Sequence, residues 1–255
     1  MNLRLGAALA LAIAALALAG PARADPDALW KIISEKCVPN EREYGQPSPC
    51  AVVDLKDGEA HGYVVLKDNV GDTQYLVMPT AKITGIEDPA VLAPDAANYF
   101  AEAWRERHFT VEAAKRDLPR AALSLAVNSV DGRSQNQLHI HIDCVTPAVR
   151  DAVRKNIAAV ADKWGPFPEL LAGHRYQALR IAGETLDRFD PFKKLADDVP
   201  GARDAMRKQT LVVIGADLEG GAPGFVILAD RADPATGDHA SGEELQDHSC
   251  ALAKP

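Results

Sequence analysis

Short apolar runs of β-forming residues, separated by turn residues, predict strands joined in pairs, with helices between the pairs. Gly71-Asp72 is typical of a hairpin turn, and residues 129–136 form a polar, glycine-containing loop. The glycine-rich residues 220–224 separate a third, less clearly patterned pair. The predicted pairs are residues 63–66 with 75–78, 122–128 with 137–145, and 211–214 with 225–228. The similarity of these hairpins hints at an internal duplication.

Helices are predicted between and after the strand pairs. Residues 25–34 and 94–109 carry apolar side chains at helical spacing. Thr146-Pro147 is typical of a helix start, and Gly165-Pro166 should end that helix near Trp164. Ser241 opens a capping-box pattern that indicates a last helix. Strands joined by turns, without strand–helix–strand alternation, indicate an α+β protein: an antiparallel sheet with flanking helices.

The N-terminus predicts export. Arg4 precedes an Ala- and Leu-rich run from Leu5 to Ala19, and Ala22-Arg23-Ala24 follows. The run is about 16 residues, which is short for a bilayer span, so residues 1–24 are interpreted as a cleaved signal peptide, with a retained membrane anchor as the alternative. No Pro/Ser-rich linker divides the remainder, so residues 25–255 are expected to form a single catalytic domain.

An exported protein meets oxidising conditions, under which an even number of cysteines suggests disulfides. Cys37 and Cys50 bracket a segment rich in turn formers, which favours pairing them and leaves Cys144 with Cys250. A thiolate nucleophile or zinc-thiolate cluster would need closer spacing, such as C-x-x-C, which the sequence lacks.

The charge balance argues against a nucleic-acid partner. The 255 residues contain 28 Lys and Arg against 36 Asp and Glu, for a net charge of −8. Nor does any run of basic residues offer a surface for a polyphosphate backbone.

The most informative segment is the H-x-H-x-D pattern at residues 139–143. On a strand, His139, His141 and Asp143 project from one face, while Ile140 and Ile142 enter the core on the other. The sequence therefore predicts two imidazoles and a carboxylate in a row at the surface of a sheet. A neutral imidazole there can be a nucleophile for phosphoryl or nucleotidyl transfer. The same row can instead hold a metal ion, since it supplies three ligands.

The segment resembles the histidine triad superfamily, whose pattern is an Asn on one strand, a polar loop, a Gln and then H-x-H-x-H. Asn128, Gln135 and Asn136 match the polar positions, and His141 matches the nucleophile. Asp143 replaces the third histidine, and its carboxylate would repel a phosphate unless it is protonated, paired with Arg133 or turned toward His139.

The whole chain after residue 24 resembles the bacterial CDP-diacylglycerol pyrophosphatase family. Five blocks in order carry the resemblance: residues 63–68, 78–80, 135–142, 173–176 and 243–250. The resemblance implies hydrolysis of CDP-diacylglycerol to CMP and phosphatidate, through a cytidylyl-histidine intermediate and without a cofactor or metal. It also implies work in the periplasm at the inner-membrane surface.

Residue roles follow from this resemblance and from side-chain chemistry. His141 is the expected nucleophile, and His139 is expected to orient it or contact phosphate. The expected substrate-binding residues are Asn128, Arg133, Gln135, Asn136 and Lys67, although Lys67 fits equally well as a solvated charge at a strand end. The alternatives are a metal-dependent phosphoester hydrolase that uses the H-x-H-x-D row, and a nucleotide- or lipid-binding protein without turnover.

Overall fold

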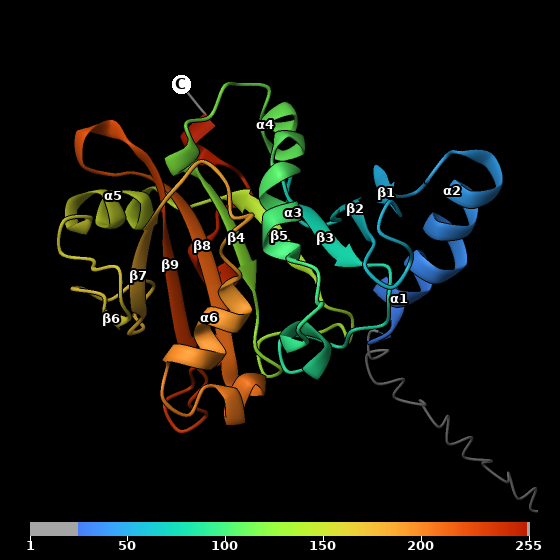
Figure 1. Ribbon diagram of the computed structural model, residues 1–255. Coiled ribbons are helices and arrows are strands. Elements are labelled where there is room, and N and C mark those ends of the chain that lie inside the picture. Colours follow the sequence, from blue (N-terminus) through green and yellow to red (C-terminus); the bar gives the residue numbers. More distant parts are fainter. Residues whose placement is uncertain (1–24, 254–255) are drawn as a thin grey trace, which may run out of the picture.

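A computed structural model describes residues 25–253, which fold around a nine-stranded sheet. Its strand order is β1-β2-β3-β5-β4-β8-β9-β7-β6, and neighbouring strands run antiparallel (Figure 1). The strands are β1 (Val52–Asp54), β2 (Tyr63–Lys67), β3 (Tyr75–Pro79), β4 (Leu123–Val127), β5 (Ile140–Cys144), β6 (Gly165–Pro166), β7 (Gln177–Ala182), β8 (Gln209–Asp217) and β9 (Pro223–Arg231). The predicted α+β class and the three predicted strand pairs are confirmed.

The helices of the described residues are short. They are α1 (Ala28–Ile32), a π-helix (Ile33–Cys37), α2 (Val38–Tyr44), α3 (Tyr99–Arg105), α4 (His108–Ala114), α5 (Pro147–Asn156) and α6 (Pro191–Asp198). Six 3-10 turns add Pro89–Leu92, Arg120–Ala122, Arg203–Lys208, Glu219–Gly221, Gly242–Leu245 and Ala251–Ala253. Within residues 25–253, no helix has the length and apolar character needed to cross a membrane. The predicted signal peptide or anchor, residues 1–24, lies outside the described residues.

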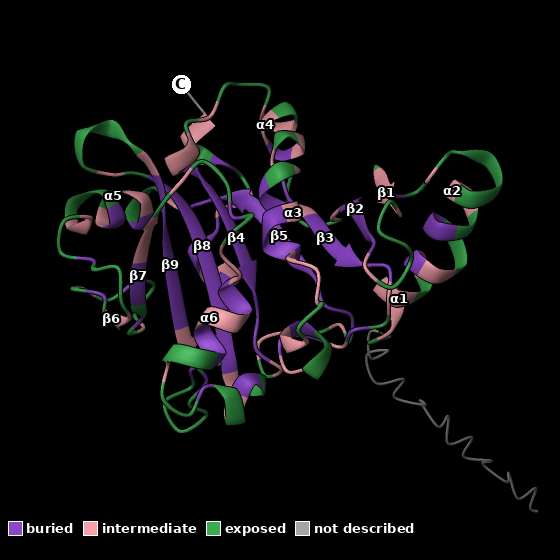
Figure 2. Ribbon diagram, in the orientation of Figure 1, coloured by how far each residue is buried: buried purple, intermediate pink, exposed green. Residues whose placement is uncertain are grey.

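One face of the sheet carries a continuous hydrophobic core. Helices α3 and α6 lie across it (Figure 1), and the strands beneath them are buried along most of their length (Figure 2). Trp104 of α3 packs edge-on against Phe225 of β9, and Phe100 packs against Phe192 of α6 at ring-centroid distances of 4.8 and 4.9 Å. Because this core spans both halves of the sheet, it holds the strands in one rigid platform.

The opposite face carries two separate hydrophobic clusters. One packs the N-terminal helices onto β2 and β3, and the other packs α5 and the C-terminal Leu245 onto β4, β8 and β9. His141 of β5 pairs with Leu76 on one side and Ala126 on the other, and these two residues belong to different clusters. The predicted histidine row therefore lies where the two clusters meet.

The helical region at the N-terminus is longer than the sequence predicts. The expected helix over residues 25–34 continues through the π-helix and α2 to Tyr44, so half of the segment between Cys37 and Cys50 is helical. Pro39 lies inside this continuous helical run, directly after the π-helix, whose irregular turn accommodates a residue that has no N–H to donate. Gly45, at φ +63°, ends the helix in the left-handed conformation.

Three other helix predictions are wrong in their bounds. The helix expected over residues 94–109 is α3 followed by α4, because the Asn98 side chain caps α3 by accepting from the N–H of Ala101. Helix α5 ends at Asn156, well before Trp164. The last helix is only the 3-10 turn Gly242–Leu245, because the Ser241 hydroxyl bonds to Asn128 and not to the turn's own backbone.

Both predicted disulfides are confirmed. Cys37 pairs with Cys50 and joins the N-terminal helices to the segment before β1. Cys144, at the end of β5, pairs with Cys250 across 106 residues. The second bridge ties the C-terminal segment to the strand that carries the histidine row.

Candidate active site

Strand β5 and the residue just before it present the H-x-H-x-D row. His139, His141 and Asp143 are only 8, 5 and 0% exposed, so the expectation that the row lies at the surface is wrong. The C-terminal segment, residues 243–250, accounts for much of the difference, because its side chains bond to His141 and Asp143. The row belongs to a buried site that is assembled from distant parts of the chain.

The two ring nitrogens of His141 have different surroundings. Its Nδ1 lies 2.8 Å from Nε2 of Gln74 and 3.1 Å from Oε1 of Glu243. Its Nε2 is buried and has no hydrogen-bond partner among the described residues. Burial, together with the nearby charges of His139 and His248, holds the pKa of His141 well below its ordinary value of 6.5. The imidazole is therefore neutral at neutral pH.

His139 packs edge-on against His141, with 4.8 Å between the ring centroids. Its Nδ1 donates a 2.5 Å hydrogen bond to the backbone carbonyl of Gln137, which fixes the ring. Burial lowers the pKa of His139, so it too is neutral at neutral pH. Two neutral imidazoles thus lie side by side on the face that lacks a continuous core.

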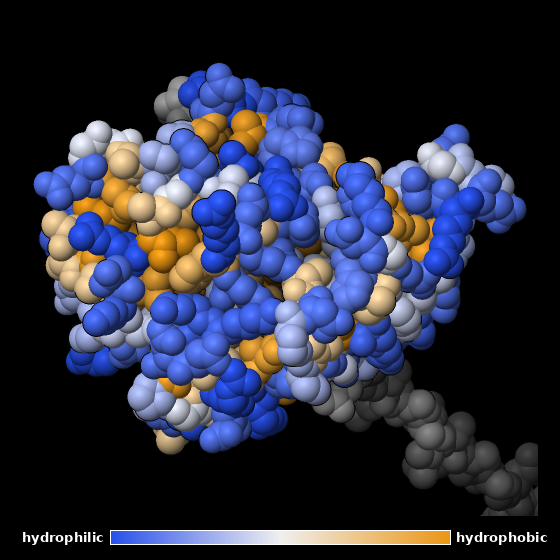
Figure 3. Space-filling model, viewed as in Figure 1, coloured by the Kyte–Doolittle hydropathy of each residue, from blue (hydrophilic) through white to orange (hydrophobic). Residues whose placement is uncertain are grey.

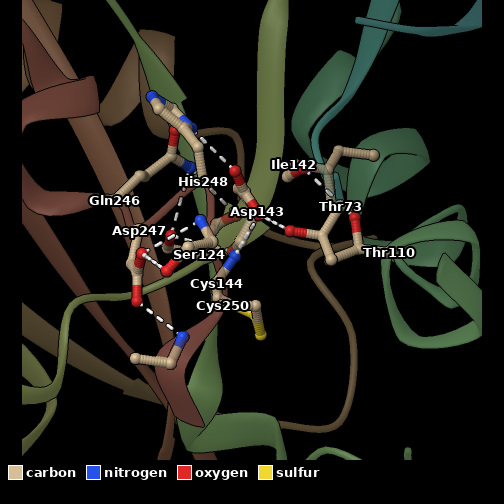
Figure 4. The surroundings of a disulfide bond; sticks show 12 residues. Thr73, Thr110, Ser124, Ile142, Asp143, Cys144, Gln246, Asp247, His248 and Cys250 are labelled. Carbon is tan, nitrogen blue, oxygen red and sulfur yellow. Dashed lines mark hydrogen bonds and ion pairs between the residues drawn. A yellow bond between two sulfur atoms is a disulfide. The ribbon is translucent and has the colours of Figure 1, made fainter. Parts of the chain in front are cut away.

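Asp143 lies next to His141 on the same face and is fully buried. Its Oδ1 accepts from the hydroxyl of Thr73 at 2.6 Å and from the N–H of Cys144 at 2.8 Å. Its Oδ2 lies 2.8 Å from Nδ1 of His248 (Figure 4). Of the possibilities that the sequence leaves open for Asp143, the structure shows neither the pairing with Arg133, which bonds to Glu87, nor the turn toward His139; the carboxylate faces His248 instead.

Asn128 reaches the site through Glu243. Its Nδ2 donates a 2.5 Å hydrogen bond to Oε2 of Glu243, whose other oxygen faces His141. Its Oδ1 accepts from the hydroxyl of Ser241 and the N–H of Glu243 at 3.3 and 3.4 Å. Asn128 thus holds the carboxylate that orients the His141 ring.

The site thus combines an oriented, neutral imidazole with neighbouring side-chain amides. The chain that carries it has clear relatives among known proteins. A family model described as CDP-diacylglycerol pyrophosphatase matches residues 24–254. A CDP-diacylglycerol pyrophosphatase of Yersinia pestis is 43% identical over 226 residues, which are 89% of this chain and 84% of that protein. The chain belongs to the CDP-diacylglycerol pyrophosphatase family. The resemblance that its five sequence blocks indicate is confirmed.

Two of the blocks that mark the CDP-diacylglycerol pyrophosphatase family meet in this site, although about a hundred residues separate them. Residues 135–142 supply both imidazoles, and residues 243–250 supply Glu243, Gln246 and His248. Gln246 donates to the carbonyl of His141 and to the hydroxyl of Ser124 at 3.2 and 3.1 Å. The last block therefore acts as part of the site.

The other predicted substrate-binding residues bond to the protein itself. Arg133 forms a two-pronged ion pair with Glu87 at 2.6 and 2.7 Å. Lys67 donates to the carbonyls of Asp68 and Gly71 at 2.7 and 3.0 Å. The roles of Arg133 and Lys67 in substrate binding stay predictions.

Gln135 and Asn136 both hold the start of the described chain. Gln135 accepts from the N–H of Leu29 and donates to the carbonyl of Asp25, at 3.2 and 3.0 Å. The N–H of Asn136 donates to the carbonyl of Pro26 at 2.6 Å. In the family member described here, the loop that precedes the histidine row is thus tied to the N-terminal segment, and its substrate-binding role stays a prediction.

Gln74, Thr73 and Glu243 are site residues to which the sequence patterns assign no role. Gln74 and Thr73 immediately precede β3, next to a predicted turn, and no local pattern marks them. Glu243 lies in the capping-box pattern and in the last block of the family resemblance, but neither assigns it to the site. The block that contains Asp247-His248 is the one signal that could have pointed to the C-terminus, since the sequence resemblance includes it.

The H-x-H-x-D row does not gather into a compact group of three ligands. Within residues 25–253, the only His, Asp, Glu or Cys cluster close enough to share a cation is His174 with Asp230 and Asp238. Asp143 turns both oxygens toward Thr73, Cys144 and His248. The metal-dependent alternative therefore gains no support from this geometry.

Proposed function

We propose that this chain hydrolyses the pyrophosphate of CDP-diacylglycerol to CMP and phosphatidate, with Nε2 of His141 as the nucleophile. The observation that carries the proposal is the contrast between the two ring nitrogens. Nδ1 faces a carboxylate, whereas Nε2 is desolvated and has no partner among the described residues. Family membership supplies the substrate class.

The tautomer required for this role has its proton on Nδ1, where the ring donates to Oε1 of Glu243 and keeps a lone pair on Nε2. This tautomer needs the Gln74 side-chain amide turned over, so that its oxygen, which has no partner among the described residues, faces Nδ1 in place of its nitrogen. The lowered pKa of His141 maintains this neutral form at neutral pH. Glu243 also stabilises the positive charge that the ring gains when Nε2 bonds to phosphorus.

The reaction takes two displacements. In the first, the Nε2 lone pair attacks the phosphorus on the cytidine side, and the bond from that phosphorus to the bridging oxygen breaks. Phosphatidate departs with the bridging oxygen and leaves a cytidylyl-histidine. In the second, water attacks the same phosphorus, the phosphorus–nitrogen bond breaks, and CMP leaves as His141 returns to its neutral form.

Substrate entry requires a rearrangement, because Nε2 of His141 is shielded from solvent. Gln135 and Asn136 bond to Asp25, Pro26 and Leu29, so release of those bonds would free amide donors for the phosphate oxygens. In this proposal His139, Asn128, Arg133 and Lys67 complete the binding site. Their contacts with the protein are expected to exchange for contacts with substrate.

The test is rapid quenching with substrate labelled in the cytidine. Wild-type protein should carry acid-labile, alkali-stable label, as expected for a phosphorus–nitrogen bond, and His141→Ala should carry none and lose turnover. His108→Ala is the matched control, since His108 lies on the exposed helix α4 and should turn over normally. Substantial turnover by His141→Ala, or one inversion at a chiral phosphorus, would contradict the proposal.

We further propose that the protein is exported to the periplasm and acts at the inner-membrane surface. Its two disulfides support an oxidising compartment, and a diacyl lipid substrate supports work at a membrane. On the face in Figure 3, apolar side chains gather most extensively at the left, in the region of α5 in Figure 1. Intact mass of the exported protein tests cleavage after Ala24; a full-length product would indicate an anchor.

Two finer fold assignments also stay proposals. The histidine triad-like fold is supported by an antiparallel sheet that carries the histidine row on β5. An internal duplication is supported only by the similar hairpins.

A further inference from the structure

His248 is the third imidazole on this face of β5, after His139 and His141. Its Nδ1 lies 2.8 Å from Oδ2 of the fully buried Asp143, and its side chain is 31% exposed (Figure 4). His141 and Asp143 are alternate residues of β5, so their Cα atoms are about 7 Å apart. Because His248 bonds to Asp143, it lies beside the position next to His141 on this face. The charge of His248 also acts on the pKa of His141.

The surroundings of His248 fix one ring nitrogen and leave the other free to act. Asp143 is itself held by Thr73 and the N–H of Cys144, so it orients the ring through Nδ1. The His248 Nε2 has no hydrogen-bond partner in the described part of the chain. Hydrogen bonding to Asp143 raises the pKa of His248, in spite of partial burial. The ring can therefore carry a proton at neutral pH while His141 does not.

Backbone contacts also position His248. The carbonyl of His248 accepts from the N–H of Asp72 at 3.1 Å. A Cβ at Gly71 would lie 2.5 Å from Cβ of His248, so the loop before β3 can approach this closely only with glycine there. The Cys144–Cys250 disulfide joins residues next to Asp143 and near His248. A solvated structural histidine would not need such support.

We propose that His248 is the acid–base catalyst of the reaction and that Asp143 is its positioning residue; this inference rests on the proposed function. When His141 attacks, Nε2 of His248 gives its proton to the departing oxygen of phosphatidate. Nε2 then takes a proton from the water that attacks the cytidylyl-histidine. The proton on His248 and the neutral state of His141 are both restored when CMP leaves.

The second step depends more strongly on His248 than the first. A phosphate monoester leaves readily without added proton because its second pKa is about 6. Water, in contrast, must lose a proton as it attacks. Loss of a general base costs typically 10²–10⁴-fold in rate. Replacement of His248 should therefore trap the covalent intermediate.

The experiment compares His248→Gln with His108→Gln by the rapid-quench assay. His248→Gln should turn over substrate about 100-fold more slowly than wild type, and close to one cytidylyl label should be bound per protein molecule at steady state. The control should match wild type. Wild-type turnover by His248→Gln, or slow turnover without label while wild type is labelled, would overturn the acid–base role. Absence of label in wild type would instead refute the covalent step through His141.

Asp143→Asn gives a second, independent measure. Loss of the carboxylate should lower the pKa of His248, so the acid limb of kcat, which reports the deprotonated base needed in the second step, should move to lower pH, whereas a purely structural role would lower the whole profile without moving it. Near-ultraviolet circular dichroism identifies folded variant protein. An unmoved limb in folded Asp143→Asn would overturn the role of His248 even if wild type carries no label.

Discussion

His141 and His248 lie beside the same strand but in opposite surroundings. His141 is almost wholly buried, its pKa is lowered, and one of its nitrogens has no partner among the described residues. His248 is partly exposed, and a buried carboxylate raises its pKa. The difference shows how neighbouring imidazoles can divide one reaction: desolvation prepares a nucleophile, and a carboxylate partner prepares a proton carrier.

Among variants that leave both histidines in place, the largest expected effect comes from removing the carboxylate that orients the nucleophile. Glu243→Gln should lower kcat about 100-fold, because the amide cannot stabilise the charged ring that forms on attack. Glu244→Gln is the matched control: the neighbouring carboxylate bonds instead to His174 and Tyr176, at 2.8 and 2.6 Å. Steady-state kinetics of both variants decide the point, and equal losses would mean that Glu243 has no special relation to His141.

The two disulfides should differ in what their removal changes: both should lower the free energy of unfolding, but only one should also lower kcat. The Cys144–Cys250 bridge closes 106 residues and the Cys37–Cys50 bridge closes 13, so the chain-entropy model gives losses of about 4.7 and about 3 kcal/mol. Only the first bridge holds His248 near Asp143. Its double serine variant should also lose about tenfold in kcat, by the usual scale for disturbed positioning residues.

Urea unfolding and activity assays on folded protein would measure both effects. The Cys37→Ser/Cys50→Ser protein should keep its kcat while losing stability. A normal kcat after loss of Cys144–Cys250 would show that the backbone contacts of His248 suffice.

The smallest expected effect is on the pH dependence of stability, and it has opposite signs at the two histidines. His141 has a lowered pKa in the folded state, so below about pH 6.5 the unfolded chain binds more protons and stability falls. His248 has a raised pKa, so its contribution is complete below about pH 6.5 and is lost as the pH rises through its folded-state value.

Urea titrations from pH 5 to 8 would test this sign difference. His141→Ala should flatten the acid side of the stability curve, and His248→Gln should flatten the neutral-to-alkaline side. Parallel curves for the two variants would contradict the contrast between their surroundings.

Much of the sheet could be predicted because its signals are local. The apolar runs of β2 and β3, the alternation on β5 and the neighbouring turn residues identify strands without reference to the rest of the chain. Helix ends were less predictable, because Asn98 and Asn156 compete with periodicity through their own side-chain hydrogen bonds. Strand β7 and helix α6 lacked a pattern strong enough for a prediction.

The site was predictable only where one strand supplies it. Strand period placed His139, His141 and Asp143 on one face, but period alone says nothing about what covers that face. Glu243 and His248 reach it through chain topology, and Gln74 through a turn. For that reason, the prediction that the histidine row is exposed was wrong.

The position of Glu243, Gln246 and His248 after the last strand of the sheet has a consequence for biosynthesis. The ribosome adds these residues after every strand has been made. A nascent chain can therefore build its hydrophobic platform while its nucleophile still lacks an orienting carboxylate and its proton carrier is absent. A product of premature termination before residue 243 would contain every strand yet leave the liponucleotide untouched.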